Sequence, residues 1–491
     1  MAHRDRWASR QAFIMAAVGS AIGLGNLWRF PMVAYANGGG AFLIPYVVAL
    51  LTAGVPLMIL EYSLGSFFQK STPGSLRAAD KRFEMIGWWA LGVGTTISLY
   101  YAVIMGWSWD YLACSFGQPW CDNAQLFFDN LLGVTDGVGY IGRISWPALI
   151  GLAVTWACIY WIIKKGVLRV GKVVMITVPL PAILLLFILI RGLTLPGALE
   201  GLKYYLTPDF GALTNARTWL QAYAQVFFSL SLGFGILTAY ASYLPKKSDI
   251  ANNAFITSFA DAGFAFFAGF AVFSVLGYLA QAQGVPVESV VKGGPSLAFV
   301  IYPTAMSLMP FAPVIAAMFF ITLLTLGIDS AFSIVEGAVA GLRDKWHISQ
   351  ERATLYFCIF GFFGGLIFTT GAGYYWLDIV DRWMNDYGLV VIGFLECIAI
   401  GWFYGTDKLR AYINEVSDFD IGIWWDIFIK WVTPLALGWA LVSNVVNDIR
   451  QPYGDYPGWA LVAGGWGVVA VIVIVAALIT RVKPVVPKEE S

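Results

Sequence analysis

The sequence is poor in charge. Of its 491 residues only 12% are Asp, Glu, Lys or Arg, while 59% are hydrophobic and 16% are aromatic. Soluble domains carry about 25% charged and 45–50% apolar residues, so this composition excludes a disordered chain and an ordinary soluble enzyme. The 30 Lys and Arg are balanced by 30 Asp and Glu, which leaves no basic surplus to bind nucleic acid.

Histidine and paired cysteine are also scarce. The two histidines, His3 and His347, lie outside the apolar segments, and the five cysteines include no Cys-x-x-Cys pair. The sequence therefore has too few suitable histidine and cysteine ligands for a zinc site or a histidine-based catalytic dyad. Cys114 and Cys121 flank one loop, and the sequence leaves open whether they form a disulfide.

Long apolar segments are abundant instead. A helix needs about 20 apolar residues to cross a bilayer, and twelve segments qualify, which predicts an all-α integral membrane protein embedded in lipid. The predicted spans, numbered one to twelve, are 11–36, 41–69, 87–114, 146–163, 172–192, 219–243, 252–281, 312–341, 351–370, 376–404, 422–446 and 457–481.

Basic residues gather on one side of these spans. With the N-terminus inside, 21 of the 30 Lys and Arg lie in inside segments and 6 in outside segments. Since positively charged loops stay in the cytoplasm, both termini are expected to be cytoplasmic. The sequence contains no Asn-x-Ser/Thr acceptor, which fits the inner membrane of a bacterium.

Spans one and six contain residues that interrupt a helix at mid-depth. Span one reads GSAIGLGNLWRFP from Gly19 to Pro31, and span six reads SLSLGFG from Ser229 to Gly235. Unpaired backbone is tolerated in a membrane only where it is buried or lines a cavity. Interruptions five spans apart indicate two halves of an internal repeat, whose freed carbonyls could bind cations. The alternative is close helix packing of the GxxxG kind, but Arg29, a costly charge inside a span, favours a functional site.

Three stretches of the sequence resemble the neurotransmitter:sodium symporter family, close to its bacterial amino-acid transporters. They are WASRQAFIMAAVGSAIGLGNLWRFP, NGGGAFLIPY and QVFFSLSLGFG, and the resemblance runs from residue 4 to about residue 408. It implies twelve transmembrane helices, of which the first ten form two inverted five-helix repeats with helices one and six broken. The expected organisation is a cytoplasmic N-terminus (1–10), a first repeat (11–192), a second repeat (219–404), helices eleven and twelve (422–481) and a cytoplasmic tail (482–491).

The resemblance also implies two sodium sites, and sodium prefers oxygen ligands. Each acid in them could instead lock helices together, but two buried acids beside two breaks favour ion sites. The first ion is expected to bind the carbonyl of Ala21 and the side chains of Asn26, Ser229 and Asp261, with the substrate carboxylate. The second is expected to bind the carbonyls of Gly19, Ile22 and Leu326 with the side chains of Asp329 and Ser330.

Chloride is not expected as a cofactor. Asp261 stands where animal members of the family have Asn, and one turn later the chain has Ala265 where they have Ser. A fixed carboxylate beside Tyr46, Gln225 and Ser229 would supply the negative charge that chloride brings.

The expected substrate is a neutral, hydrophobic L-amino acid. Monoamine transporters carry Asp where this chain has Gly23, so the substrate must bring its own carboxylate. By the resemblance, the carboxylate would meet Tyr101 and the amides of Leu24 and Gly25. The α-ammonium would meet the carbonyls of Ala21 and Phe228 and the hydroxyls of Ser229 and Ser231. The substrate side chain would contact Ile97, Phe228, Phe234, Ser330 and Ile334.

Two gates are expected from the resemblance. Arg29 and Asp381 would close the site from outside, above Tyr101 and Phe234. Arg4 and Asp344 would close it from the cytoplasm, braced by Trp7. Other membrane acids are Glu61, expected to bind unwound backbone of spans one and six, Glu336, placed on the inward path, and Glu396, which has no assigned function.

Together these features predict a secondary active transporter that couples inward sodium flow to amino-acid uptake by alternating access. A membrane enzyme would need an acidic or histidine-rich cluster at a membrane face, and the sequence has neither. A channel and a sodium-dependent sensor remain as alternatives.

Overall fold

The computed structural model describes residues 5–485. Its elements in this range are helices, and the one β contact is an isolated antiparallel bridge between Ile144 and Thr370. The predicted all-helical class is therefore confirmed. Among the predicted site residues, Arg4 lies outside the described part of the chain.

Ten helices in the described range are long and apolar enough to cross a membrane, or eleven if one bent pair counts as a single span. Span six is not among them, because the predicted segment 219–243 forms two short helices, Ala216–Ser229 and Ile236–Ala241, as its expected interruption implies. The ten helices are Gly39–Phe68, Lys81–Cys114, Trp146–Ile163, Val167–Leu193, Ala251–Gln283, Ala312–Trp346, Gln350–Thr369, Gly373–Val416, Ile423–Arg450 and Gly458–Arg481, and the bent pair is Arg10–Ala21 with Leu24–Ala36.

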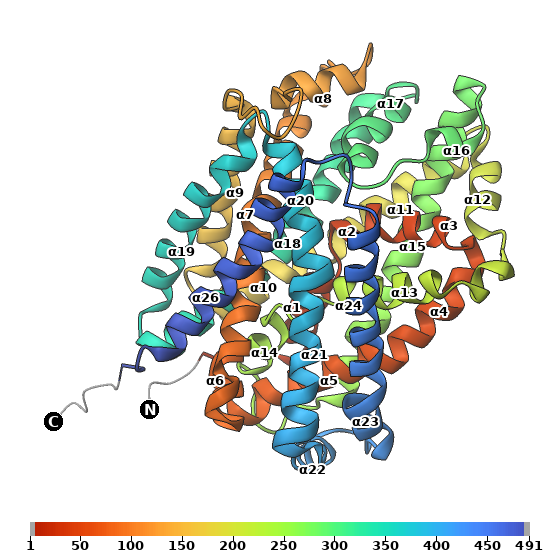
Figure 1. Cartoon of the computed structure of the whole chain (residues 1–491). Coiled ribbons are helices and arrows are strands. Elements are labelled where there is room, and N and C mark those ends of the chain that lie inside the picture. Colours follow the sequence, from red (N-terminus) through yellow and green to blue (C-terminus); the bar gives the residue numbers. More distant parts are fainter. Residues whose placement is uncertain (1–4, 486–491) are drawn as a thin grey trace.

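These spans are assembled from shorter helical elements, labelled in Figure 1. The α-helices are α1 (Arg10–Ala21), α2 (Leu24–Trp28), α3 (Phe30–Ala36), α4 (Leu43–Ala49), α5 (Val55–Phe68), α6 (Thr72–Ala79), α7 (Glu84–Cys114), α8 (Ala124–Leu132), α9 (Trp146–Ile163), α10 (Val167–Thr177), α11 (Pro179–Leu193), α12 (Ala198–Leu206), α13 (Ala216–Ser229), α14 (Ile236–Ala241), α15 (Ala251–Gln283), α16 (Val287–Val290), α17 (Tyr302–Ser307), α18 (Ala312–Trp346), α19 (Gln350–Gly365), α20 (Gly373–Trp383), α21 (Val390–Ile398), α22 (Thr406–Val416), α23 (Ile423–Ile427), α24 (Thr433–Arg450), α25 (Gly458–Ala460) and α26 (Val468–Arg481). The 3₁₀ and π segments between them are η1 (Gly39–Phe42), η2 (Leu50–Gly54), η3 (Lys81–Phe83), η4 (Phe210–Thr214), η5 (Leu297–Ile301), η6 (Leu366–Thr369), η7 (Met384–Leu389), η8 (Ala399–Gly405), η9 (Phe428–Val432) and η10 (Leu461–Gly467).

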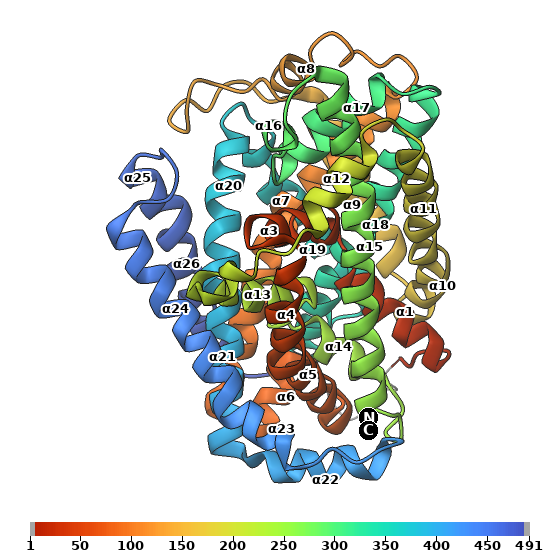
Figure 2. The ribbon, with the colours of Figure 1, turned by 90° about the vertical axis from the view of Figure 1, so that its right-hand side faces the viewer.

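The two ends of the bundle are formed by different helices, and both ends of the described chain lie at the lower one. In Figures 1 and 2, α8, α16 and α17 lie at the upper end, and α6, α22 and α23 lie at the lower end. The upper helices lie in the connections between predicted spans three and four (α8) and between predicted spans seven and eight (α16 and α17). The described chain starts and finishes at the lower end, where Trp7 N–H donates to the Tyr243 carbonyl at 3.2 Å and Val485 N–H to the Lys345 carbonyl at 3.1 Å.

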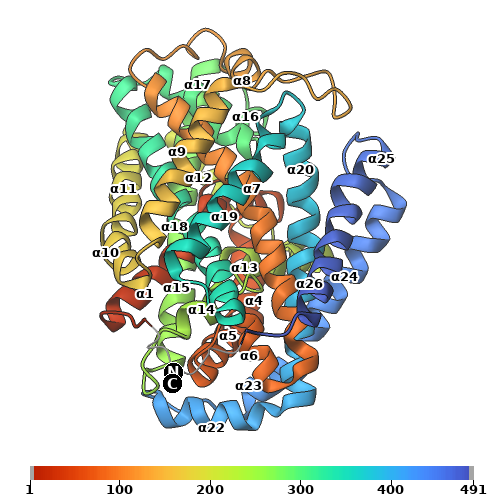
Figure 3. The same cartoon turned by 90° about the vertical axis from the view of Figure 1, so that its left-hand side faces the viewer.

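The interrupted helices lie in the centre of the bundle. α1 packs against α14, α15 and α18, and α7 packs along α18. Figure 3 shows α24 and α26 at one side of the bundle. The most apolar part of span twelve is only 22% buried, against 72% for span three. Span twelve therefore exposes most of its surface at the edge of the bundle, while span three lies inside it.

Candidate functional site

Span one is interrupted between α1 and α2. α1 ends at Ala21, Ile22 and Gly23 are extended, and the chain then resumes as α2 with a bend of 50°. The side-chain oxygen of Asn26 accepts the Gly23 N–H at 2.9 Å, which satisfies a backbone donor at the new helix start. A Cβ on Gly23 would lie 2.8 Å from Ser330 Oγ, so glycine lets span one approach span eight.

Span six is interrupted between α13 and α14. Ser231, Gly233 and Gly235 have φ angles of 55°, 76° and 76°, a region that glycine enters without strain and other residues rarely adopt. Glu61 Oε1 accepts the Gly233 N–H at 2.8 Å, so the expected contact between Glu61 and unwound backbone is confirmed for span six. Ser231 Oγ donates to the Ser20 carbonyl at 2.8 Å, which joins the two breaks directly.

Three residues predicted for the first sodium site meet beside these breaks. Asn26 Nδ2 donates to Asp261 Oδ1 at 2.7 Å and to Ser229 Oγ at 3.2 Å, and Ser229 Oγ donates to Asp261 Oδ2 at 2.7 Å. All three side chains are buried. Spans one, six and seven thus bring a carboxylate, a carboxamide and a hydroxyl together, within reach of the end of α1 at Ala21.

The second predicted set meets between spans one and eight. Asp329 Oδ2 would lie 3.2 Å from a Cβ on Gly19, so the carboxylate faces the end of α1 just before the extended Ile22. Next to it, Ser330 Oγ donates to the Leu326 carbonyl at 3.4 Å. Asp329 Oδ1 accepts a hydrogen bond from a residue that the sequence did not single out, Thr177 of span five, at 2.6 Å.

Both clusters fit a cation. Asp261 and Asp329 are 0% and 2% exposed, and no Lys or Arg among residues 5–485 lies within 4 Å of either carboxylate. A buried carboxylate without a counter-charge is costly. Carboxylate, amide, hydroxyl and carbonyl oxygens are the ligands that a hard cation prefers, so sodium would complete each cluster.

A cavity of about 370 Å³ lies against both clusters. Part of its lining consists of backbone and hydroxyl groups, including Tyr101, whose Oη accepts the Leu24 N–H at 3.4 Å. The eleven residues predicted to bind substrate all line it, namely Ala21, Leu24, Gly25, Ile97, Tyr101, Phe228, Ser229, Ser231, Phe234, Ser330 and Ile334.

The cavity continues toward the upper end of the bundle past the predicted outer gate. Arg29 and Asp381 both line it, yet they form no ion pair within 4 Å in the described chain. The Arg29 guanidinium lies over the Phe228 ring at 4.7 Å. Asp381 Oδ1 instead accepts hydrogen bonds from Tyr100 Oη at 2.6 Å and Asn385 Nδ2 at 2.9 Å. The two gate residues are therefore apart, and the cavity is open on this side.

The lower side is closed around Trp7. Its side chain is 5% exposed, and its indole N–H donates to the Tyr240 carbonyl at 2.8 Å. The expected partner pair cannot be assessed because Arg4 is not described, although Asp344 Oδ2 accepts the Ser71 N–H at 2.6 Å. A neighbouring pair crosses the same region, with Arg343 Nη1 at 3.6 Å from Asp5 Oδ2.

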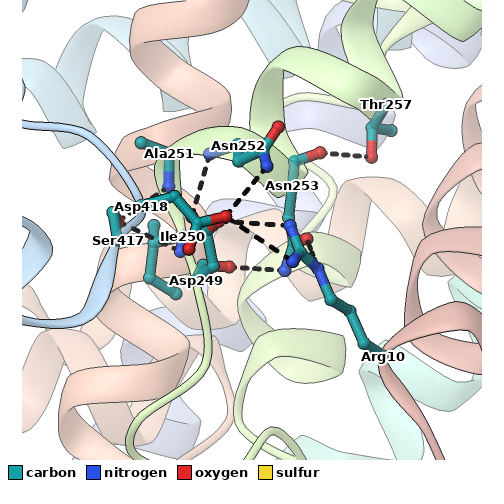
Figure 4. A network of polar contacts seen from close by, with 9 residues as sticks. All are labelled: Arg10, Asp249, Ile250, Ala251, Asn252, Asn253, Thr257, Ser417 and Asp418. Carbon is teal, nitrogen blue, oxygen red and sulfur yellow. Dashed lines mark hydrogen bonds and ion pairs between the residues drawn. The ribbon is translucent and has the colours of Figure 1, made fainter.

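A second network fastens the start of α1, as Figure 4 shows. Arg10 contacts Asp249 at 3.1 Å, Asn253 at 2.8 Å and Asp418 at 3.8 Å. Burial, and then the adjacent Asp418 carboxyl, raise the pKa of Asp249, and the hydrogen bond from Asp249 lowers the pKa of Asp418. Ser417 Oγ accepts the N–H groups at the start of α15. The network ties α1 to the connections before α15 and after α22.

Sequence reasoning missed three residues of this arrangement. Thr177 lies in an apolar run and Asp249 in a loop, and neither position carries a signal of its own. Arg10 counted only as a basic residue beside the membrane. Each has a partner more than 150 positions away in the chain, so only the fold reveals the contact.

Comparison with known proteins finds relatives along nearly the whole chain. A model of the sodium:neurotransmitter symporter family matches residues 4–128 and 121–485. An uncharacterized sodium-dependent transporter of Methanocaldococcus jannaschii is 43% identical over 98% of both chains. A creatine transporter of Torpedo marmorata is 35% identical over 94% of this chain and 82% of its own length. The human sodium- and chloride-dependent creatine transporter 1 is 35% identical over 94% of this chain and 80% of its own.

Proposed function

This chain belongs to the sodium:neurotransmitter symporter family, and on that premise we propose that it imports a neutral, hydrophobic L-amino acid by alternating access. As a member it is a multi-pass, sodium-dependent membrane transporter and not an enzyme. The proposal adds the substrate class, two sodium ions per cycle and independence from chloride.

The observation that carries the proposal is the position of the cavity. It lies where two helix breaks expose backbone groups, and residues from spans one, three, six and eight line it. The clusters of the two buried acids reach it through neighbouring residues that line it, Asn26 and Ser229 for Asp261 and Ser330 for Asp329. A substrate held there would share its surroundings with both cations, which is the arrangement that coupling requires.

The lining favours an amino acid as the substrate. At the start of α2 the Gly25 amide lies in the cavity lining beside the Tyr101 hydroxyl, which accepts the Leu24 N–H at 3.4 Å, and both groups could donate to a carboxylate near the positive end of the helix. The lower part of the cavity is apolar, with Ile97, Phe234 and Ile334. A Cβ on Gly94 would lie 3.2 Å from Ile334 Cγ2, so the apolar part is closed at that point.

Creatine is the second candidate, because two of the relatives carry its name. Its carboxylate would fit the same helix start. Its guanidinium group would need polar or acidic partners. The residues expected to contact the substrate side chain are apolar apart from Ser330, namely Ile97, Phe228, Phe234 and Ile334. The lining therefore supports an amino acid over creatine.

The free energy for uptake would come from sodium. One charge that crosses 100 mV contributes about 2.3 kcal/mol, and a sodium gradient adds to this. Two ions could thus support accumulation over several orders of magnitude. Asp261 and Asp329 are the residues we assign to the first and second ion.

The proposed architecture is twelve spans, with the bent pair as span one and α13 with α14 as span six. Spans one to five and six to ten would form two inverted repeats, each beginning with its interrupted span. The lower end of the bundle, with both ends of the described chain and the basic connections, would face the cytoplasm of a cell with this protein in its plasma membrane.

Reconstituted vesicles test the function. Purified protein in proteoliposomes should accumulate one or a few radiolabelled neutral amino acids under an inward sodium gradient, in a screen of the twenty amino acids and creatine. Counterflow of the labelled substrate separates a transporter from a sensor, which would bind without exchange, and from a channel, which would not concentrate it. Binding without counterflow, or accumulation of creatine alone, would contradict the proposal.

Replacing chloride with gluconate tests the anion requirement. The fixed charge of Asp261, followed by Ala265 instead of a hydroxyl residue, leads us to expect unchanged sodium-driven uptake. The human relative is named as chloride-dependent and serves as the control for the exchange of anions. Loss of uptake in gluconate would show that the carboxylate does not replace the anion.

A further inference from the structure

The second cation cluster has a partner outside spans one and eight. Thr177 of span five donates from Oγ1 to Asp329 Oδ1 at 2.6 Å. The Thr177 hydroxyl also lies 3.1 Å from the Val173 carbonyl, one turn earlier in its own helix. Since a hydroxyl has one hydrogen to donate, only one of these two bonds can form at a time. The bond to a carboxylate is the shorter and the stronger kind.

Because of this bond, the two oxygens of the Asp329 carboxylate have different surroundings. Oδ1 is held by Thr177, while Oδ2 faces the end of α1, where a Cβ on Gly19 would lie 3.2 Å away. The carboxylate is therefore fixed in rotation, with one oxygen aimed at the break that supplies the carbonyl groups. A cation between the break and Oδ2 would find its ligand already oriented.

A second residue of span five, Val178, lies next to the Asp329 cluster. The Cγ2 atom of Val178 lies 2.6 Å from the position of a Cβ on Gly19, so Val178 packs against Gly19 while Thr177 bonds Asp329. Pro179 and Pro181 follow directly, and neither can donate a backbone hydrogen bond to the preceding turn. Contact with the cluster is thus made by the least regular part of span five.

We propose that Thr177 is a positioning residue of the second sodium site, whose hydroxyl holds one oxygen of Asp329 so that the other faces span one. The inference rests on the proposed sodium coupling and adds a residue of span five to it. Without the hydroxyl, Asp329 Oδ1 is a buried acceptor with no partner, and the carboxylate loses its fixed orientation.

Sodium-dependent thermal stability tests the proposal without transport. The melting temperature of purified protein is measured in detergent against rising sodium, with choline keeping the ionic strength constant. Thr177→Val, which keeps the shape and removes the hydroxyl, should raise the sodium concentration for half-maximal stabilisation by roughly tenfold, as expected for a lost hydrogen bond to a charged group. Thr177→Ser should restore it to within about twofold of the wild type.

Thr155→Val is the matched control. Thr155 is buried in span four, and its hydroxyl donates to the Gly151 carbonyl of its own helix at 2.9 Å, so its loss should leave the sodium dependence unchanged. Equal half-saturation in wild type and Thr177→Val would overturn the role of Thr177 alone. No stabilisation of the wild type by sodium would overturn the proposed coupling as well, and a failed rescue by serine would show that shape, not the hydroxyl, matters.

Discussion

At the scale of single residues, Arg29 is held by a contact that a transport cycle can break. Its guanidinium rests on the Phe228 ring at 4.7 Å, and a cation–π contact of this kind contributes about 0.5–1 kcal/mol at an accessible site. Asp381, its expected partner, is occupied by Tyr100 and Asn385. Arg29 therefore contributes little to the stability of this arrangement, and the gate proposed for it would form only when the site closes.

Replacing Arg29 should accordingly separate transport from stability. Arg29→Gln is expected to reduce sodium-driven uptake at least about tenfold while the melting temperature changes by no more than about 2 °C, because only the weak ring contact is lost. Uptake into proteoliposomes and thermal unfolding are the two measurements. Arg191→Gln is the control, since Arg191 donates to the Thr194 hydroxyl at the end of α11, away from the cavity lining. Normal uptake by Arg29→Gln would remove it from the gate.

Individual residues also show where sequence reasoning succeeds. Asn26, Asp261 and Asp329 could be found because a polar or charged side chain inside an apolar span is costly and rarely incidental. Thr177 could not be found, since a threonine satisfies its hydroxyl within its own helix and so carries no such cost. Its bond to Asp329 depends on how spans five and eight pack, which no local pattern encodes.

At the scale of elements, the break in span six depends on glycines that no other residue replaces well. Gly235 has a φ of 76°, and a Cβ there would lie 2.9 Å from Leu91 Cδ2 and 3.0 Å from Thr72 Oγ1. Gly235→Ala should therefore lower the free energy of unfolding by more than about 1 kcal/mol, through backbone strain and crowding. Gly263→Ala is the opposite case, because Gly263 lies within the helix α15 with nothing within 4 Å of a new Cβ. Alanine should stabilise that helix slightly, and thermal unfolding of both variants compares them; equal effects would contradict the strain.

The network around Arg10 joins three elements and should respond to pH. Because the pKa of Asp249 is raised in the folded protein, its favourable contribution is complete below its ordinary pKa and is lost as the pH rises through the raised value. Asp249→Asn keeps a neutral side chain that can donate to Asp418 at any pH. The variant should gain stability relative to the wild type as the pH rises from the ordinary pKa of an aspartate through the raised value, measured as the difference in melting temperature. A variant that loses relative stability over that range would show that Asp249 acts as an anion toward Arg10.

At the scale of the whole molecule, the cavity is open at one end of the bundle and closed at the other. Met32 lines its outer part, whereas Ser333 is fully buried. In a chain with Cys114 and Cys121 replaced by Ser, Met32→Cys should react with a membrane-impermeant maleimide added from outside, and substrate with sodium should slow the reaction several-fold. Ser333→Cys should stay unlabelled in both conditions. Labelling of Met32→Cys that substrate leaves unchanged would contradict closure over the cavity.

The overall fold was largely predictable because length and apolarity mark a membrane span directly. Eleven of the predicted segments overlap the ten spanning helices and the bent pair. The ends of the helices were less predictable. The helix expected at 376–404 runs from Gly373 to Val416, and the helical turns after residue 404 are too polar to be recognised as part of a span. The interruption of span six was predictable from its composition, but the two helices α13 and α14 that result follow from positive φ angles at Ser231, Gly233 and Gly235.

The shortness of those two helices bears on how the chain enters a membrane during synthesis. α13 has 14 residues and α14 has 6, which correspond to lengths of about 21 Å and 9 Å, against a hydrocarbon layer of about 30 Å. Neither can be recognised alone as a stop signal by the insertion machinery. We therefore expect span six to be inserted with the help of its neighbours. The same break that exposes backbone to the cavity would then make the topology of the second half depend on spans five and seven.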